Sequence, residues 1–368
     1  MTDPIERVES YRANVSAHLV KLSDVLPLRT PFSIMIDPAN ACNFRCSFCP
    51  TGDFDLLRSV QRPKGVMSWD LFCKIIDDVS GFDDKVKVLW LHKDGEPFLN
   101  KSLGKMIAYA KDKGIAESIR TVTNGSLLTT DRAVEVIEAG LDYIKISIEH
   151  VSDTGYKEVT QTATKYESIL QNVRSLYLEK IRKSVKLRVY VKILDIGLSQ
   201  EEKQKFLNDF SEYCDEINIE EMMGWSKSNV KDFTLGQEPK TGMCGASPLK
   251  KNRIACPEPF KGIAINFDGS VSVCCVDWSH GTVVGNASKE SVVDIWQGEH
   301  LLNFRLKHLT GKRHDIDACR NCQFMLGLPE QSDIDDALDT LRARYQLAAI
   351  QASSSPARCS NQSSKSCC

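Results

Sequence analysis

Three cysteines lie close together in the stretch CNFRCSFCP (residues 42–50), at Cys42, Cys46 and Cys49. Thiolates grouped in this way suit an iron–sulfur cluster or a zinc ion. A zinc site needs a fourth ligand nearby, and the next His or Cys along the chain is Cys73, which we expect in the hydrophobic core. A four-iron cluster held by three cysteines instead leaves one iron with an open position, which is typical of a catalytic metal.

A second group of cysteines lies in the C-terminal third of the chain. Cys256 is followed by the neighbours Cys274 and Cys275, and then by Cys319 and Cys322 in a C-x2-C spacing. Four thiolates are enough for a closed four-cysteine cluster site, and a structural zinc ribbon is the alternative for the same residues.

The choice between the two neighbouring cysteines depends on a hairpin that the Asp-Gly pair at 268–269 predicts over residues 262–275. Side chains alternate between the two faces of a strand, so Cys275 would share a face with two valines and point into the core. Cys274 is then the better ligand. The predicted ligands of the second site are Cys256, Cys274, Cys319 and Cys322.

Length and composition limit what else the protein can be. The 368 residues carry a formal net charge of −2, which gives no field to attract nucleic acid or an anionic membrane. The 14 cysteines are clustered and the N-terminus has no apolar secretory segment, so we expect metal ligation in place of disulfides. No apolar run approaches the roughly 18 residues of a membrane-spanning helix. We therefore expect a cytoplasmic protein with neither nucleic acid nor a membrane as partner.

The elements between the cysteines must position them. From residue 33 to about 221, runs with strand character alternate with amphipathic stretches such as 68–79. The predicted strands are residues 33–37, 87–92, 118–123, 143–149, 186–194 and 216–221. Such alternation implies parallel strands with right-handed crossovers, so we predict an α/β fold with a partial (βα)6 barrel. Functional groups should gather at the carboxyl ends of its strands.

The pattern changes after residue 221, where a stretch rich in Gly, Lys, Ser and Pro reads as a linker. The predicted divisions are an N-terminal helical extension (1–30), the core barrel (31–221), the linker (222–253), a small α+β module with the second cysteine group (254–328), a C-terminal helix (329–351) and a disordered tail (352–368). Within the module we expect one helix from about residue 291 to 309, and the last helix should cover about 333–350.

The spacing C-x3-C-x2-C after a strand, with the aromatic Phe48 before the last cysteine, resembles the radical S-adenosylmethionine superfamily. In that family three cysteines hold a 4Fe-4S cluster whose open iron binds the amino and carboxyl groups of S-adenosylmethionine. Reduction by a donor such as flavodoxin or ferredoxin cleaves this cofactor to a 5′-deoxyadenosyl radical that abstracts hydrogen. The resemblance covers about residues 30–221 and implies that the cofactor takes the place of the fourth ligand.

A second match to the family follows the predicted second strand. Gly95, Glu96 and Pro97 resemble the Gly-Gly-Glu-Pro segment that binds the amino group of the cofactor, although Asp94 stands in place of the first glycine. A carboxylate suits an ammonium group at this position. The Thr-Asn-Gly sequence at 123–125 ends the third strand, as it does in many members of the family.

Two more strands carry matching residues. Ser147 and Glu149 end the fourth strand, where the family contacts the ribose or the carboxylate of the cofactor. Lys192 lies on the fifth strand, from which it either reaches the cofactor carboxylate or faces outward.

The second cysteine group, C-x12-G-x4-C followed by C-x2-C, resembles the SPASM/twitch extension of many radical S-adenosylmethionine enzymes. The full SPASM pattern continues with three more cysteines and binds two auxiliary clusters. The residues QFMLGLPEQS that follow Cys322 contain none. The resemblance therefore implies the shorter twitch form, with one auxiliary 4Fe-4S cluster.

Two classes of function compete on this evidence, a radical enzyme and a zinc-binding interaction protein without catalysis. Many peptide-modifying members carry an N-terminal peptide-binding domain, and only about 30 residues precede the first strand here. This favours a small-molecule substrate, an alcohol of sugar or aminocyclitol type that is oxidised with the auxiliary cluster as electron acceptor. A peptide- or protein-modifying maturase, similar to the sulfatase maturases, is the alternative.

The sequence does not identify the base that such an oxidation needs. Candidate polar groups at the strand ends are His92, Lys93, Asp94, Glu149, His150, Glu220 and Glu221. The loop 51–65 should pack over the active site. Its Arg58, Arg62 and Lys64 either receive a phosphate or carboxylate or, as we expect, face solvent.

Overall fold

The computed structural model of the chain describes residues 4–17, 20–245 and 247–354. A single nine-stranded sheet has the order β6-β5-β4-β3-β2-β1-β7-β8-β9, so among the described residues it ends at β6 and at β9 without closing. The strands are β1 (Ser33–Ile36), β2 (Val86–Leu91), β3 (Ala116–Thr123), β4 (Tyr143–Ile148), β5 (Arg188–Leu194), β6 (Glu216–Glu220), β7 (Gly262–Ile265), β8 (Ser270–Ser272) and β9 (Val283–Asn286). Strands β1 to β6 are parallel, which confirms the partial barrel.

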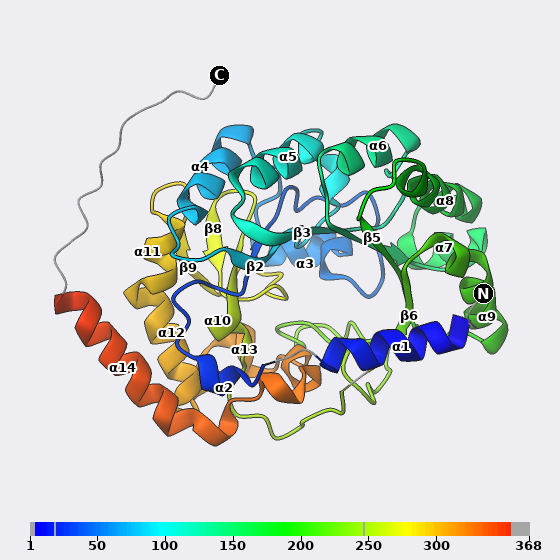
Figure 1. Ribbon diagram of the computed structural model, residues 1–368. Helices are drawn as coiled ribbons and strands as arrows, with labels where there is room; N and C mark the ends of the chain where they lie inside the picture. The colour runs from blue at the N-terminus through cyan, green and yellow to red at the C-terminus, as the bar shows by residue number, and fades with distance from the viewer. Residues whose placement is uncertain (1–3, 18–19, 246, 355–368) are drawn as a thin grey trace.

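Helices cover the convex face of this sheet (Figure 1). They are α4 (Trp69–Val79), α5 (Leu103–Lys113), α6 (Thr130–Glu138), α7 (Asp153–Thr160), α8 (Tyr166–Arg182) and α9 (Gln200–Phe210). Alternate strand residues such as Ile34 and Ile36 join the helices in one large apolar core. The side chains between them point to the concave face, where aromatic residues such as Tyr143 and Tyr190 lie beside charged ones such as Lys145.

The short elements of the chain complete the description. Besides α3 (Phe54–Ser59), the 3-10 helices are η1 (Pro50–Gly52), η2 (Pro97–Leu99), η3 (Ser211–Tyr213), η4 (Lys312–Asp315), η5 (Phe324–Gly327), η6 (Glu330–Ser332) and η7 (Asp335–Ala337). No helix in the described part of the chain is long and apolar enough to cross a membrane.

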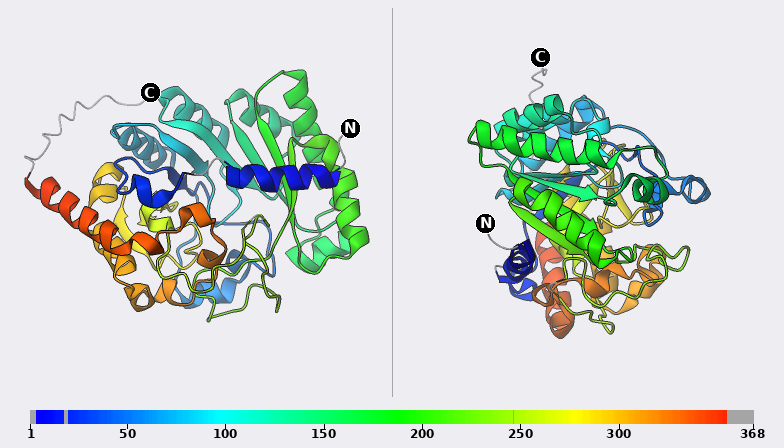
Figure 2. Two further views of the ribbon diagram at one scale, coloured as in Figure 1. Left: turned by 60° about the horizontal axis from the view of Figure 1, so that its bottom comes forward. Right: turned by 90° about the vertical axis from the view of Figure 1, so that its right-hand side faces the viewer.

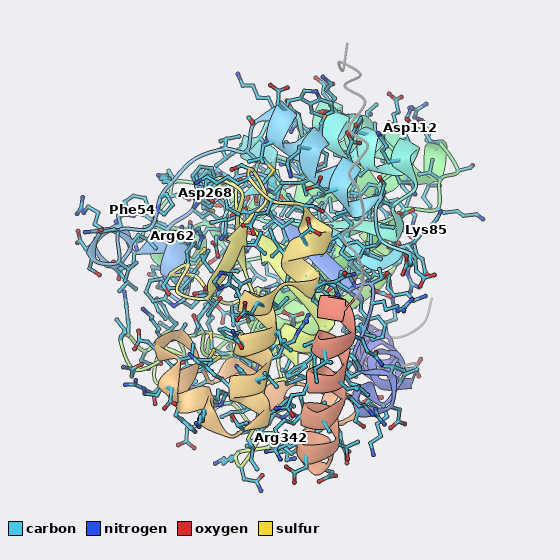
Figure 3. The ribbon with its side chains drawn as sticks, turned by 90° about the vertical axis from the view of Figure 1, so that its left-hand side faces the viewer. Phe54, Arg62, Lys85, Asp112, Asp268 and Arg342 are labelled. Atoms are coloured by element: carbon cyan, nitrogen blue, oxygen red, sulfur yellow. The ribbon has the colours of Figure 1, made fainter. Side chains whose placement is uncertain are left out.

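The C-terminal module extends the barrel sheet. Strand β7 pairs in parallel with β1, Ser33 opposite Gly262, and the hairpin partner β8 pairs antiparallel with β7. The remaining helices are α10 (Glu258–Lys261), α11 (Val292–Gln297), α12 (Glu299–Leu309), α13 (Asp317–Arg320) and α14 (Leu338–Ser354). Figures 1 and 3 show α14 lying along α12 on the outside of the module.

Three predicted boundaries were wrong. The helix expected over 291–309 is two helices, because Gly298 adopts an extended conformation between them. The last helix begins at Leu338, after Asp335 has turned its carboxylate to the backbone N–H groups of Ile254 and Ala255. It runs to Ser354, so the predicted tail begins later than residue 352, and residues 355–368 lie outside the described chain.

At the opposite end of the sheet, helix α1 (Pro4–Ala17) covers the outer edge of β6, and α2 (Leu22–Val25) follows it. The Arg12 guanidinium donates to the carbonyl of Ile219 (2.9 Å) and to Oδ1 of Asn218 (3.1 Å). The Tyr11 ring stacks on Tyr190 of β5, with 4.6 Å between the ring centroids. Figure 2 shows α1 beside the strands at this end of the sheet. An exposed strand edge can pair with other chains, and α1 blocks that pairing.

We expect Arg12→Ala to loosen this cover. Each hydrogen bond to a charged group contributes about 1.5–3 kcal/mol, so amide hydrogen exchange in residues 216–220 should accelerate by about tenfold or more. Mass spectrometry of exchanged peptides measures this rate. Glu9→Ala, an exposed change on the same helix, is the control and should leave the rate unchanged.

Candidate functional site

The first three cysteines lie on a compact loop after β1. Backbone N–H groups of Cys49 and Gly52 close two successive turns on the carbonyls of Cys46 and Cys49, each at 3.0 Å. Cys42 Sγ accepts the Phe44 N–H at 3.4 Å. Burial raises the pKa of Cys42 to about 12, and Cys49 raises it further, so the sulfurs are close enough to interact. Cys42 and Cys49 likewise raise the pKa of Cys46 after burial.

Gly95 lies where the turn after β2 touches the cysteine loop. A side-chain carbon at this position would lie 2.2 Å from the Ala41 carbonyl oxygen and 2.3 Å from that of Ala39, so only glycine fits. The Glu96 N–H donates to the Ala41 carbonyl at 2.9 Å and fixes the contact. Pro97 then begins the 3-10 helix η2. The predicted second motif therefore packs directly against the predicted cluster loop.

Glu96 is a buried carboxylate held in one orientation. It accepts hydrogen bonds from the N–H groups of Phe98 (3.0 Å) and Asn124 (2.8 Å) and from the Thr123 hydroxyl (2.8 Å). Burial nevertheless raises its pKa to about 7. A carboxylate that is aimed by three donors and lies beside the cysteine loop suits a charged amino group.

The other predicted cofactor residues meet at the ends of β4 and β5. Ser147 is in register with Lys192, and Glu149 is buried just beyond β4. Burial raises the pKa of Glu149 to about 7, and Lys192 opposes that shift. The Lys192 side chain is 11% exposed and its Nζ lies 3.7 Å from Glu220 Oε2, so it does not face outward. Lys192 also lowers the pKa of Cys46.

Phe48 is buried against Val159 and Met222, and its carbonyl accepts the Trp225 indole N–H at 3.1 Å. The aromatic residue of the first motif therefore anchors the loop to the segment after β6.

The second cysteine group lines one enclosed cavity. Its walls include all four predicted ligands, Cys256, Cys274, Cys319 and Cys322. Apolar residues such as Val273 and Met325 and polar residues such as His308 and Arg313 make up the rest of the lining. Burial raises the pKa of Cys319 to about 12 and that of Cys322 to about 11, so these thiols must lose protons when a metal binds.

The reasoning that chose Cys274 over Cys275 was wrong in its premise. Strand β8 ends at Ser272, so alternation does not extend to Cys275, which lies half-buried in a turn. Cys275 still raises the pKa of Cys274 and of Cys322, so it lies close to the cavity. The cavity lining, rather than the strand pattern, distinguishes the two cysteines.

Within the described residues, no three His, Cys, Asp or Glu side chains converge as a single metal ion would require. The thiolates around a four-iron cluster bind different irons and need not converge on one point. This finding is therefore compatible with a cluster at either cysteine group.

A buried group of charges joins the two cysteine regions. Asp94 Oδ2 lies 2.7 Å from Lys93 Nζ, 3.0 Å from His280 Nε2 and 3.5 Å from an Arg62 guanidinium nitrogen. Lys93 also donates to the Asp277 carbonyl at 3.0 Å. Burial alone would raise the pKa of Asp94, but Lys93, His280 and Arg62 together hold it well below its usual range. We call this set the Asp94 ion group.

Arg62 corrects the expectation that the basic residues of loop 51–65 face solvent. Its side chain is 1% exposed and donates to the carbonyls of Asn40 and Trp278. Arg58 and Lys64 are exposed, as expected. Figure 3 shows Phe54 at the outer edge of the molecule, with Arg62 nearer its body.

The polar residues that were predicted at the strand ends do not all lie together in the structure. On the concave face, Glu220 Oε1 accepts hydrogen bonds from Lys145 Nζ at 2.6 Å and from the Tyr190 hydroxyl at 2.9 Å. Lys192 Nζ lies 3.7 Å from the other carboxylate oxygen, Glu220 Oε2. His92 points to the same face, where burial and then Lys145 lower its pKa to about 3. His150 and Glu221 do not join this set. His150 pairs with Glu202 of α9 at 3.3 Å, and Glu221 lies half-buried beyond β6.

Sequence reasoning missed Asp37, Asp277 and His280. Asp277 accepts hydrogen bonds from Gly281 and Thr282 and shapes the loop that carries His280. His280 has a φ of 53°, a left-handed conformation that is uncommon outside glycine and clusters at functional sites. No motif marks these residues, although Asp37 is the last residue of a predicted strand.

Comparisons with known proteins agree with this geometry. A family model described as the Radical SAM superfamily matches residues 36–202, and one described as an iron–sulfur cluster-binding domain, SPASM, matches residues 256–323. The chain therefore carries a Radical SAM domain followed by a C-terminal SPASM domain. It is an iron–sulfur enzyme, so the alternative of a zinc-binding interaction protein was wrong. Its cofactors are S-adenosylmethionine, a 4Fe-4S cluster in the Radical SAM domain and auxiliary iron–sulfur clusters in the SPASM domain.

Two curated relatives differ in how far they match. The chain is 24% identical over 329 residues to the tungsten-containing aldehyde ferredoxin oxidoreductase cofactor-modifying protein of Pyrococcus furiosus, covering 78% of this chain and 86% of that protein. It is 24% identical over 211 residues to GTP 3′,8-cyclase of Staphylococcus aureus, covering 55% of this chain and 57% of that protein.

Solved structures share the fold. BtrN in complex with AdoMet and 2-DOIA has a TM-score of 0.51 at 19% identity, covering 79% of this chain and 92% of BtrN. Streptococcus suis SuiB bound to S-adenosylmethionine has a TM-score of 0.56 at 14% identity, covering 77% and 70%. The protein anSMEcpe with bound AdoMet has a TM-score of 0.53 at 12% identity, covering 87% of this chain and 98% of anSMEcpe. These identities support a common fold and nothing finer.

We expect Asp94→Asn to destabilise the protein by about 3–5 kcal/mol, because it leaves Lys93 and Arg62 buried without their counter-charge. Chemical denaturation measures the free energy of unfolding. Asp55→Asn is the control, since Asp55 is 87% exposed and its surface pair contributes about 0–1 kcal/mol. Equal stability of the two variants would contradict a structural role for the Asp94 ion group.

We expect the triple change of Cys42, Cys46 and Cys49 to Ala to lower the iron content from about eight to about four atoms per chain. The second cysteine group lies on different elements and should keep its cluster. Iron analysis and electron paramagnetic resonance of reconstituted protein measure both quantities.

A matched pair of single variants completes this test. Cys274→Ala should lose the auxiliary cluster, whereas Cys275→Ala should keep it. The reverse result would move the ligand assignment by one residue.

Proposed function

We propose that this enzyme oxidises a small-molecule alcohol, of sugar or aminocyclitol type, with an auxiliary 4Fe-4S cluster as electron acceptor. The observation that carries the proposal is the covered edge of β6. Extended peptides often bind by adding a strand to an open sheet edge. Of the two edges of the described sheet, α1 occupies the β6 edge, at the barrel end, through Arg12 and Tyr11, while the β9 edge lies in the C-terminal module.

The concave face supports a small polar substrate. It presents Lys145, Lys192 and Glu220 on β4 to β6, and His92 at the end of β2. Such convergent donors and acceptors suit the hydroxyl and amino groups of a polyol. Among the proteins of like fold, BtrN was crystallised with AdoMet and 2-DOIA, and SuiB with precursor peptide SuiA, so fold alone leaves both substrate types open.

We assign the residues as follows. Cys42, Cys46 and Cys49 hold the catalytic cluster, and Glu96, in the segment Gly95 to Pro97, binds the amino group of S-adenosylmethionine. The remaining cofactor contacts are Phe48, Ser147, Glu149 and Lys192, and the auxiliary ligands are Cys256, Cys274, Cys319 and Cys322. The catalytic cluster and S-adenosylmethionine supply a radical that abstracts hydrogen from the substrate carbon. A flavodoxin or ferredoxin supplies the electron that starts the reaction.

The test is a substrate screen with anaerobically reconstituted enzyme, reductant and S-adenosylmethionine. We expect a cyclitol, aminocyclitol or pyranose to stimulate 5′-deoxyadenosine formation and to lose two hydrogens, as measured by mass spectrometry. Cys319→Ala/Cys322→Ala should abolish this oxidation and leave some cleavage of S-adenosylmethionine. Stimulation by Ser- or Cys-containing peptides alone would instead support the maturase alternative.

A further inference from the structure

Asp37 is a buried acid without a partner. It directly follows β1, five residues before Cys42, and its exposure is 0%. Neither carboxylate oxygen accepts a hydrogen bond of normal geometry among the described residues, although the backbone N–H of Asp94 lies near enough to lower the pKa of this carboxyl. Buried polar side chains are nearly always hydrogen-bonded, so two orphaned oxygens on one carboxylate require an explanation.

The direction of this side chain places it toward the concave face. Ile34 and Ile36 of the preceding strand pack into the core on the helix side. The Asp37 N–H still donates to the Ile265 carbonyl at 2.9 Å, so the extended pairing continues one residue beyond β1 and Asp37 follows the opposite series with Met35. His92, which follows the neighbouring strand β2, also points to this face.

The surroundings of Asp37 join the two cysteine regions. Asp94, Lys93 and Arg62 all act on it electrostatically. Lys93 in turn donates to the carbonyl of Asp277, three residues after the auxiliary ligand Cys274. Asp37 therefore lies between the loop of the catalytic cluster and the loop that leads from the auxiliary site.

The two aspartates of this region have opposite titration behaviour. Burial and then the charge of Asp94 raise the pKa of Asp37 to about 7, while Lys93 and Arg62 oppose the shift. Asp94 stays ionised because Lys93, His280 and Arg62 compensate its charge. Two carboxyl groups with pKa values driven apart commonly divide acid and base roles, and a base works best when its pKa lies near the working pH.

Other acids nearby are already engaged. Glu96 accepts three hydrogen bonds, and Glu220 is held by Lys145 and Tyr190. The His280 imidazole is tied to Asp94. Glu149, which faces Lys192, is assigned to the cofactor. Among the described residues near Asp94, Asp37 is the carboxylate with both oxygens buried and unpartnered.

We propose that Asp37 is the base that takes the hydroxyl proton of the substrate during oxidation. The proposal rests on the proposed function and names its missing proton acceptor. The substrate loses a hydrogen atom from carbon, which goes to the deoxyadenosyl radical. It also loses a proton from oxygen to Asp37 and an electron to the auxiliary cluster, which leaves a carbonyl product and balances the reaction.

The test compares reconstituted wild type with Asp37→Asn, a change that keeps the shape of the side chain and removes its basicity. The probe is the cyclitol, aminocyclitol or pyranose that wild type oxidises in the screen, deuterated at carbon. We expect Asp37→Asn still to move deuterium into 5′-deoxyadenosine but to form carbonyl product about 100-fold more slowly, as loss of a general base predicts.

Two control variants test whether the effect is specific to Asp37. Asp268→Asn, at the exposed hairpin tip labelled in Figure 3, should behave as wild type. His280→Gln tests the competing base, and it should retain product formation better than Asp37→Asn. A readout independent of turnover is infrared difference spectroscopy of the reconstituted protein, in which one protonated carboxyl band, beyond those that Glu96 and Glu149 contribute to wild type and variant alike, should disappear as the pH rises through about 7. That band should be absent in Asp37→Asn.

The outcomes separate the two proposals. Unchanged product formation in Asp37→Asn, or uncoupling by His280→Gln alone, would overturn the role of Asp37 and leave the alcohol oxidation standing. Absence of the titrating band in wild type would likewise count against Asp37. If wild type oxidises no alcohol in the screen, the proposed function fails, and the role of Asp37 as its base fails with it.

Discussion

The buried charge of Asp94 is the constraint on which the arrangement of the two cysteine regions depends. Its carboxylate meets Lys93 from its own turn, Arg62 from the loop after α3 and His280 from the loop after β8. A buried charge that loses a partner is costly, so these three segments must take their places together. The ion group therefore fixes the C-terminal module on the barrel more specifically than apolar contact alone would.

The same interaction explains how the chain tolerates its departure from the Gly-Gly-Glu-Pro pattern. Gly95 cannot change, because backbone carbonyls of Ala39 and Ala41 leave no space for a side chain. The preceding position is different, since the Asp94 carboxylate is in contact with Lys93, Arg62 and His280. The side chain at this position is used to connect the cofactor-binding turn to the auxiliary module.

Much of the fold could be predicted because its signals are local. Alternating apolar residues and short-range spacing identified six parallel strands, and the predicted motif residues do lie at their carboxyl ends. Contacts between segments far apart in the sequence leave no such local signal. The hairpin after Gly262 joins β1 across more than half of the chain, and Arg62 is buried because its partners include the distant Trp278. The predicted orientation of Cys275 was wrong because strand β8 ends at Ser272, three residues before it.

The charge balance of the Asp94 ion group also bears on how a proton and an electron could leave one substrate. Lys93 and Arg62 match Asp94 and an ionised Asp37 in charge, and the buried Asp277 also acts on Lys93. Uptake of a proton by Asp37 would make this set more positive by one charge, beside the loop that follows Cys274. An electron arriving at the auxiliary cluster would meet that charge across a low-dielectric interior, where opposite charges attract strongly. In the proposed reaction, proton and electron transfer therefore favour each other without a change of fold.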